Sequence, residues 1–304
     1  MLVEALQKHF DQYADKGLFT PTPELLKEAT EAFEEALRGV YKEHKNHFPR
    51  ASALGHEARR LWYMRQNPEL KNSIGVFVSM TGNIWEPVLI YFLKEAGVPI
   101  RNIQATGKAK FGRYVVPGSI DFECKINGEW GVVDAKTCSD YSWKTKWSDV
   151  RNLVENDPYG YIPQAAVYEE TRGVPFHGWL VKNKGGADFD GNLNRLLKFV
   201  GAEPIRDHIQ AEKEKIRKKL LEAHKDERPT QCYPVVSEYY NPKNKDGFYT
   251  GNHKVDNRCA KCPFVGECFP NATQAKRGSM PIYYVGNVVY NVPGVKIVLE
   301  SKDE

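Results

Sequence analysis

The spacing of apolar residues changes along the chain from a helical period to a strand period. Residues 22–44, "TPELLKEATEAFEEALRGVYKEH", carry apolar side chains at helical spacing, with Thr22 as a cap and Pro23 at the first helical position. Residues 81–97 also predict a helix, which Gly97 closes. The N-terminal third of the chain is therefore expected to be largely helical.

Strand-like runs begin near residue 98 and then alternate with helices. Residues 98–137 predict several strands, and residues 175–184 predict one more. Residues 161–173 predict a short helix with a proline near its start and a glycine after its end. A long charged helix is expected over 203–228, and two short strands are expected within 280–300. This order of elements predicts the α/β class.

The dipeptide Asn127-Gly128 lies between two strand-like runs. Asn-Gly is a strong hairpin signal, because a type I′ turn requires positive φ at both central residues. Pairing should therefore run outward from Ile126 opposite Glu129.

Counting back along this predicted hairpin places Asp121 directly opposite Asp134, with Cβ atoms roughly 4.5–5.5 Å apart. Lys136 follows two residues later and should point to the same face as Asp134. Two carboxylates this close repel each other, and a divalent cation such as Mg²⁺ offsets that charge better than one lysine does. The alternative is a surface hairpin whose charges protect a sheet edge. The apolar residues before Asp134 favour a buried strand.

The composition is compatible with a folded globular protein but does not by itself indicate one function. The chain has 304 residues, 41% of them hydrophobic, which is enough for one large domain or two modest ones, and its net charge of +4 permits a nucleic-acid partner. The N-terminus lacks the basic-then-apolar pattern of a signal peptide, and no apolar run has membrane-spanning length. We therefore expect a soluble, cytoplasmic protein with no membrane partner.

Four short motifs follow one another along the chain: Gly82-x-x-x-Glu86-Pro87, Asp121, Asp134-x-Lys136 and Gln164-x-x-x-Tyr168. Together they resemble the motifs of PD-(D/E)xK nucleases, and the last resembles that of the RecB-like branch. The segment "GNIWEP" resembles the corresponding motif of lambda exonuclease and its viral relatives. The RecB-like CRISPR adaptation nucleases usually have histidine where Glu86 stands, so the chain departs from them there.

The resemblance implies a restriction-endonuclease-like core with a central mixed β-sheet flanked by helices. It implies a metal-dependent DNA exonuclease that hydrolyses phosphodiester bonds in recombination, repair or viral DNA processing, in the host cytoplasm if the protein is viral. DNA would be its partner, with a recombination or replication protein as a second one. The alternatives are a structure-specific endonuclease and a nucleic-acid-binding protein with a degenerate nuclease site.

The same resemblance assigns roles to the motif residues. Glu86, Asp121 and Asp134 would hold Mg²⁺ or Mn²⁺, and Lys136 would orient the attacking water or offset phosphate charge. Gln164 and Tyr168 lie one helical turn apart, hence on one helix face, and would flank the site. The alternative for this last pair is an amphipathic helix with Tyr168 in the core.

Two segments carry candidate DNA contacts. Arg50, Ser52, Arg59 and Arg60 lie in a segment that resembles the family's entry motif, where such residues bind phosphate. Lys144 and Lys146 lie in "YSWKTKW", where aromatic residues alternate with lysines as they do in platforms for single strands. Both segments are equally compatible with solvent-exposed surface.

Three cysteines cluster late in the chain as Cys259-x2-Cys262-x5-Cys268. This spacing resembles the C-terminal half of the [4Fe–4S] site in AddB and the CRISPR adaptation nucleases. Their upstream cysteine has no counterpart here, because the matching segment at 55–63 contains none. Cys232 is therefore the expected fourth ligand, and a structural Zn²⁺ is the alternative to the cluster.

Such a centre is expected to be structural, because four thiolates leave no open position for a substrate water. If Cys232 lies elsewhere, the fourth ligand must come from His253, Cys124, Cys138 or His56. Otherwise, we expect Cys124 and Cys138 to be core residues and not ligands.

The pattern as a whole predicts three parts. These are a helical N-terminal extension over 1–47, a nuclease core with the charged helix over 48–228, and a cysteine module with C-terminal strands over 229–304. The sequence leaves the oligomeric state open.

Overall fold

The computed structural model describes residues 2–16, 21–41, 48–67, 73–157, 159–185, 192–241 and 247–298. The chain divides into two compact units. The first unit comprises residues 1–56 and 71–220, and the second comprises 57–70 and 221–304. This division differs from the three predicted parts, because the N-terminal helices belong to the first unit and residues 57–70 belong with the C-terminal segment.

The helices of the first unit largely follow the apolar patterning. They are α1 (Leu2–Lys16), α2 (Pro23–Tyr41), α4 (Ser73–Glu95), α5 (Asp140–Thr145), α6 (Asn152–Glu155), α7 (Tyr161–Arg172) and α8 (Arg206–Ala223), with 3₁₀ turns η1 (Ala51–Ala53), η2 (Leu193–Arg195) and η3 (Glu203–Ile205). The Thr22 hydroxyl accepts the N–H of Leu25 at 3.2 Å, so the predicted cap is confirmed. Gly97, with φ of 70°, follows α4 as predicted. Within the described ranges, no helix is long and apolar enough to cross a membrane.

A mixed five-stranded sheet forms the centre of the first unit. Its strands are β1 (Ile100–Arg101), β4 (Phe122–Ile126), β5 (Glu129–Cys138), β6 (Phe176–Asn183) and β7 (Leu197–Gly201), in that order. Only the β5–β6 pair is parallel, and α5, α6 and α7 lie in the connection between these two strands. A separate antiparallel pair consists of β2 (Thr106–Phe111) and β3 (Tyr114–Ser119). The predicted central mixed sheet flanked by helices is confirmed.

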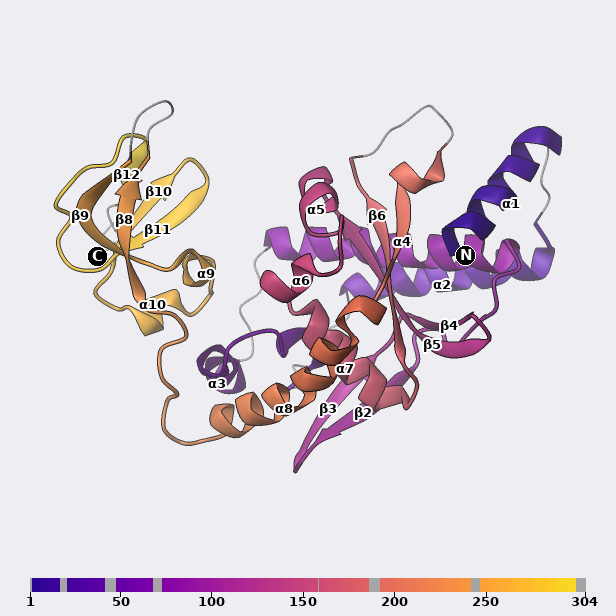
Figure 1. Cartoon of the computed structure of the whole chain (residues 1–304), viewed down its shortest axis with the longest axis horizontal. Helices are drawn as coiled ribbons and strands as arrows, with labels where there is room; N and C mark the ends of the chain where they lie inside the picture. Colours follow the sequence, from indigo (N-terminus) through magenta and orange to yellow (C-terminus); the bar gives the residue numbers. More distant parts are fainter. Residues whose placement is uncertain are drawn as a thin grey trace. The chain divides into compact units, whose positions relative to one another are not determined.

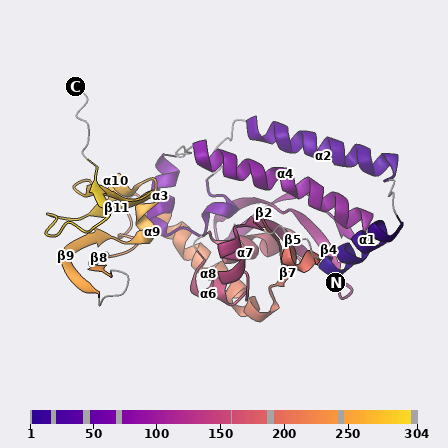
Figure 2. The same cartoon turned by 90° about the horizontal axis from the view of Figure 1, so that it is seen from above.

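Helices cover both faces of this sheet. Figure 2 shows α4, with α2 outside it, on one side and α7 on the other, and Figure 1 shows the strands between them. On the α4 side, a core cluster joins α1 and α4 to the sheet through Leu6, Leu93, Phe122, Val133 and Leu180. The alternation of β5 puts Val133 and Ala135 on that side. Asp134 and Lys136 therefore point toward the opposite face.

The second unit is built on an antiparallel sheet. Its elements are α3 (Ala58–Gln66), β8 (Val235–Tyr240), β9 (Phe248–Val255), α9 (Asn257–Ala260), α10 (Val265–Cys268), β10 (Thr273–Arg277), β11 (Met280–Tyr284) and β12 (Val295–Ile297), with sheet order β12-β10-β11-β9-β8. The two strands predicted within 280–300 are confirmed as β11 and β12. The hairpin of β8 and β9 was missed, and it fills most of the interval between Cys232 and Cys259.

A buried polar network lies where the register of this hairpin shifts, between Ser237 and Tyr239. Glu238 is 1% exposed and accepts hydrogen bonds from Asn252 at 2.9 Å and from the Tyr284 hydroxyl at 3.0 Å. The backbone bends at Gly251, where φ is 82°. These polar positions break the apolar alternation by which strands are usually recognised.

Candidate active site

The β4–β5 hairpin adopts the register that the Asn-Gly turn predicts. Asn127 and Gly128 have φ of 52° and 87°, and the ladder runs from Ile126–Glu129 to Phe122–Val133. Asp121 lies one residue beyond this ladder, in the bend before β4.

The side chain of Asp121 nevertheless reaches β5. Its Oδ2 atom accepts the backbone N–H of Ala135 at 2.6 Å. The carboxylate therefore lies beside Asp134, although the two residues do not form a ladder pair.

Asp134 is a buried carboxylate with unmet hydrogen-bonding capacity. Its side chain is 1% exposed, and Lys136 Nζ lies 2.5 Å from Oδ2. The ammonium is close enough to Oδ2 to form a short ion pair, whereas Oδ1 has no hydrogen-bond partner among the described residues. Orphaned buried oxygens are costly for a fold and are rarely kept without a use.

Two further carboxylates complete the cluster. Burial raises the pKa of Glu86, on α4, to about 7, and the charge of Asp134 adds to that rise. Burial also raises the pKa of Asp121, as do the neighbouring charges of Asp134 and Glu86. Asp134 thus raises the pKa of both other carboxylates, and Glu86 raises that of Asp121, so the cluster resists full ionisation with only one lysine beside it.

Lys136 is the cation of this cluster. Burial opposes its charge, but Asp134, Asp121 and Glu86 outweigh burial and raise its pKa. The ammonium therefore stays protonated at neutral pH and available as a donor.

Helix α7 adds a tyrosine and an amide to the site. Gln164 Nε2 donates to the Tyr168 hydroxyl at 2.7 Å. Burial, followed by the charges of Asp134 and Asp121, raises the pKa of Tyr168. Tyr168 is 4% exposed, so it is a core residue and a neighbour of the carboxylates at the same time.

Two residues at the site were not predicted. Gln104 donates to Glu86 through its side chain, and its backbone N–H donates to the Asp121 carbonyl at 2.9 Å. Lys136 Nζ lies 5.7 Å from the centre of the Tyr161 ring. Tyr161 lies at helical spacing from Gln164 and Tyr168, on the same helix face, and this spacing could have identified Tyr161 as a site residue. Nothing local in the sequence marks Gln104.

A cavity of about 620 Å³ between α2 and α4 reaches the carboxylate cluster from one side. Its lining includes Glu86 and Gln104 together with Ser119. The Glu86 end of the cluster is therefore next to open volume.

The donor set fits a hard cation. In the described part of the chain, no three His, Cys, Asp or Glu side chains are arranged so that they could hold one metal ion as they stand. Even so, the unpartnered Oδ1 of Asp134 and the raised pKa values of Asp121 and Glu86 identify a place where added positive charge is stabilising. Oxygen ligands are those that Mg²⁺ and Mn²⁺ prefer.

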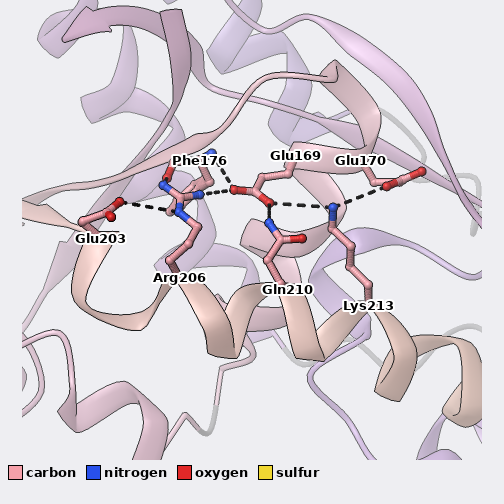
Figure 3. A network of polar contacts seen from close by, with 7 residues as sticks. All are labelled: Glu169, Glu170, Phe176, Glu203, Arg206, Gln210 and Lys213. Atoms are coloured by element: carbon pink, nitrogen blue, oxygen red, sulfur yellow. Dashed lines mark hydrogen bonds and ion pairs between the residues drawn. The ribbon is translucent and has the colours of Figure 1, made fainter. Parts of the chain in front are cut away.

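A second buried carboxylate on α7 has the opposite character. Glu169 accepts the Phe176 N–H at 2.9 Å and Gln210 Nε2 at 2.6 Å, and it forms ion pairs with Arg206 and Lys213 (Figure 3). Both of its oxygens are thus occupied. This network joins α7 to β6 and α8 and has no unmet demand for a ligand.

The candidate DNA contacts of the first unit are accessible. Arg50 and Ser52 are exposed beside η1. Lys144 is exposed on α5 and forms an ion pair with Asp140 at 2.6 Å. Lys146 is half-buried.

Arg59 and Arg60 belong to α3, in the second unit. Arg59 is buried at 8% exposure, and Arg60 lines a cavity beside the cysteines. These positions give no support for phosphate binding by Arg59, because its guanidinium is largely inaccessible. The sequence motif could not reveal this placement, since α3 packs through Tyr63, whose ring stacks on Phe264 at 5.3 Å.

The four late cysteines lie together in the second unit. Cys232, Cys259, Cys262 and Cys268 line one small cavity of about 20 Å³. Burial raises the pKa of Cys259 to about 12, and the charges of Cys232 and Cys262 contribute. Cys232 therefore lies beside the other three, as expected, and burial raises the pKa of Cys232 and Cys262 as well. Cys124 and Cys138 are buried in the first unit, as expected for core residues.

Comparisons with known proteins leave the family open. No family model matches the chain, and no curated protein matches it. A solved structure titled "Crystal structure of SSO0001" is similar at 15% identity and a TM-score of 0.34, over 61% of this chain and 82% of that one.

Proposed function

We propose that this protein is a metal-dependent deoxyribonuclease, with exonuclease activity favoured over internal cleavage. The observation that carries the proposal is Asp134, a buried carboxylate paired through Oδ2 with Lys136, with Oδ1 unpartnered and Asp121 and Glu86 beside it. Such an arrangement is destabilising for a fold and useful for hydrolysis.

In this proposal Asp121, Asp134 and Glu86 hold Mg²⁺ or Mn²⁺. The ion, when bound, supplies a Lewis acid for the scissile phosphate and lowers the pKa of a water. The carboxylates keep this charge in place, and their mutual repulsion falls as a result.

Lys136 is the proposed donor to the reacting groups. An ammonium has three N–H groups and Asp134 Oδ2 occupies one direction, so in this proposal the others orient an attacking water or bind a phosphate oxygen. Tyr168 keeps its proton because its pKa is raised, and Gln164 fixes the position of its hydroxyl. Tyr168 therefore acts as a hydrogen-bond donor beside the carboxylates and not as a base.

Digestion of end-labelled linear DNA and closed-circular DNA with Mg²⁺ or Mn²⁺ tests this function. We expect the linear DNA to be degraded from its ends and the circle to resist. Cleavage of the circle would support the structure-specific endonuclease instead. A wild-type protein that cleaves neither DNA with either metal would contradict the proposal.

We further propose that Cys232, Cys259, Cys262 and Cys268 hold a structural metal centre in the second unit. The resemblance favours a [4Fe–4S] cluster, whereas a cavity of about 20 Å³ has room for one small ion and favours Zn²⁺. Anaerobic purification should give a brown protein with about four irons per chain. A colourless protein with one zinc would select the alternative, and absence of both metals would contradict the centre.

A further inference from the structure

Two neighbouring tyrosine rings with a lysine at each end lead from the carboxylates to the surface. Lys136 Nζ lies 5.7 Å from the Tyr161 ring centre, and the Tyr161 and Tyr159 rings lie 5.6 Å apart. Lys146 Nζ in turn lies 4.5 Å from the Tyr159 ring centre. These contacts therefore join the candidate catalytic lysine to an exposed tyrosine.

Tyr159 has no structural need to be aromatic. Its side chain is 62% exposed, so its ring contributes little to the core. Tyr161, by contrast, packs on the buried Trp147 at 5.1 Å and is anchored. A fixed inner ring and an open outer ring make a platform on which a flat ligand can stack.

Three further lysines of the first unit lie at the end of β5. Lys182, Lys184 and Lys198 surround Cys138 at the end of β5, where each lowers the thiol pKa against the larger effect of burial. Two of these lysines also lie over aromatic rings, Lys182 at 4.5 Å from Trp85 and Lys198 at 3.9 Å from Trp143. Cations thus pair repeatedly with aromatic rings near the end of β5, but Trp85 and Trp143 are only partly exposed, whereas Tyr159 is open to solvent.

We infer that Tyr159 and Lys146 form a stacking site for an unpaired nucleotide, which makes the first unit select single-stranded over duplex DNA. A base stacks on the Tyr159 ring, and Lys146 moves from that ring to the adjacent phosphate, which its flexible stem permits. Bases inside a duplex cannot offer a face to a side chain without being unstacked. The inference rests on the proposed function, because it states which form of DNA, single-stranded, reaches the site around Lys136.

Binding in buffer without divalent metal tests the inference apart from cleavage. Fluorescence anisotropy would compare a labelled single-stranded oligonucleotide with a blunt duplex of the same sequence. Tyr159→Ala should weaken single-strand binding about tenfold, as expected for the loss of one base stack. Duplex binding should change less than twofold, and Tyr159→Phe should behave as wild type.

Tyr13→Ala is the matched control, because Tyr13 is an exposed tyrosine on α1. It should change neither affinity by more than twofold. An equal loss of single-strand and duplex binding in Tyr159→Ala, no loss at all, or a loss of the same size in Tyr13→Ala would overturn the inference.

A measurement on the wild-type protein guards against misfolding of the variant. A 2-aminopurine base moved stepwise along the single strand should be quenched at one position, because stacking on a ring quenches it. Quenching at none of the positions would overturn the inference. If the protein binds single strands selectively through Tyr159 but cleaves no DNA, the inference stands and the nuclease proposal fails. If it cleaves DNA but Tyr159→Ala leaves single-strand binding unchanged, the nuclease proposal stands and the inference fails.

Discussion

Asp134 and Glu169 are both buried carboxylates of the first unit, yet their surroundings differ in kind. Glu169 has a partner for each oxygen, including Arg206 and the Phe176 N–H (Figure 3). Asp134 has one ion pair and two further carboxylates beside it. The difference teaches that burial alone does not identify a functional acid; unmet hydrogen bonds and like charges do.

Asp134→Asn should produce the largest effect, and it should fall on activity. Loss of one carboxylate should weaken charge stabilisation by several kcal/mol, on the order of 10³-fold in cleavage rate. The unfolding free energy should stay unchanged or rise, because a repelling charge is removed. Cleavage rates and urea unfolding of the same preparation check both parts. A variant that is as active as wild type would remove Asp134 from the mechanism.

Glu169→Ala should do the reverse. Removing Glu169 leaves Arg206 with only the exposed Glu203, 3.7 Å away, and should lower the unfolding free energy by about 3–5 kcal/mol. The cleavage rate per folded molecule should not change. Glu170→Ala is the control, since Glu170 is 38% exposed and its pair with Lys213 should contribute about 1 kcal/mol or less. Equal losses in the two variants would break the comparison.

Glu123 extends the comparison to the pH dependence of the unfolding free energy. Its burial favours the neutral acid, but hydrogen bonds from Arg172, Asn102 and Arg101 outweigh burial and lower its pKa below the ordinary value near 4.5. A lowered pKa in the folded state contributes stability above the unfolded pKa, and this contribution is lost as pH falls through the folded pKa. Glu123→Gln should therefore be less stable than wild type by about 2 kcal/mol at pH 7.

That difference should shrink as the pH falls below about 4, as urea unfolding over a pH series would reveal. A gap that is constant with pH would mean that the charge of Glu123 does not stabilise the fold.

Lys144→Gln should have the smallest effect on stability, because its ion pair with Asp140 is exposed. We expect a change below about 0.5 kcal/mol. If Lys144 contacts phosphate, the slope of log affinity against log salt should fall by about 1. A salt titration of DNA binding checks this, and an unchanged slope would remove Lys144 from the DNA surface.

Local sequence signals predicted much of this fold and part of the site. The Asn127-Gly128 turn set the hairpin register, and helical spacing placed Gln164 and Tyr168 on one face of α7. These features depend on a few neighbouring residues, so the chain carries them locally.

Features that depend on distant contacts were not predicted. The β8–β9 hairpin was missed because the buried Glu238 and Asn252 interrupt its apolar pattern. Gln104 reaches Glu86 from a turn far along the chain, and the place of α3 depends on the stacking of Tyr63 on Phe264. Tertiary packing, rather than any local propensity, decides each of these.

Calorimetric titration of the metal-free full chain with Mn²⁺ tests the central claim most directly. The account predicts that wild type binds Mn²⁺ and that Asp134→Asn binds it at least tenfold more weakly, while Glu170→Ala matches wild type. Equal Mn²⁺ affinity in wild type and Asp134→Asn would contradict the claim that the cluster of Glu86, Asp121 and Asp134 is built to hold a cation.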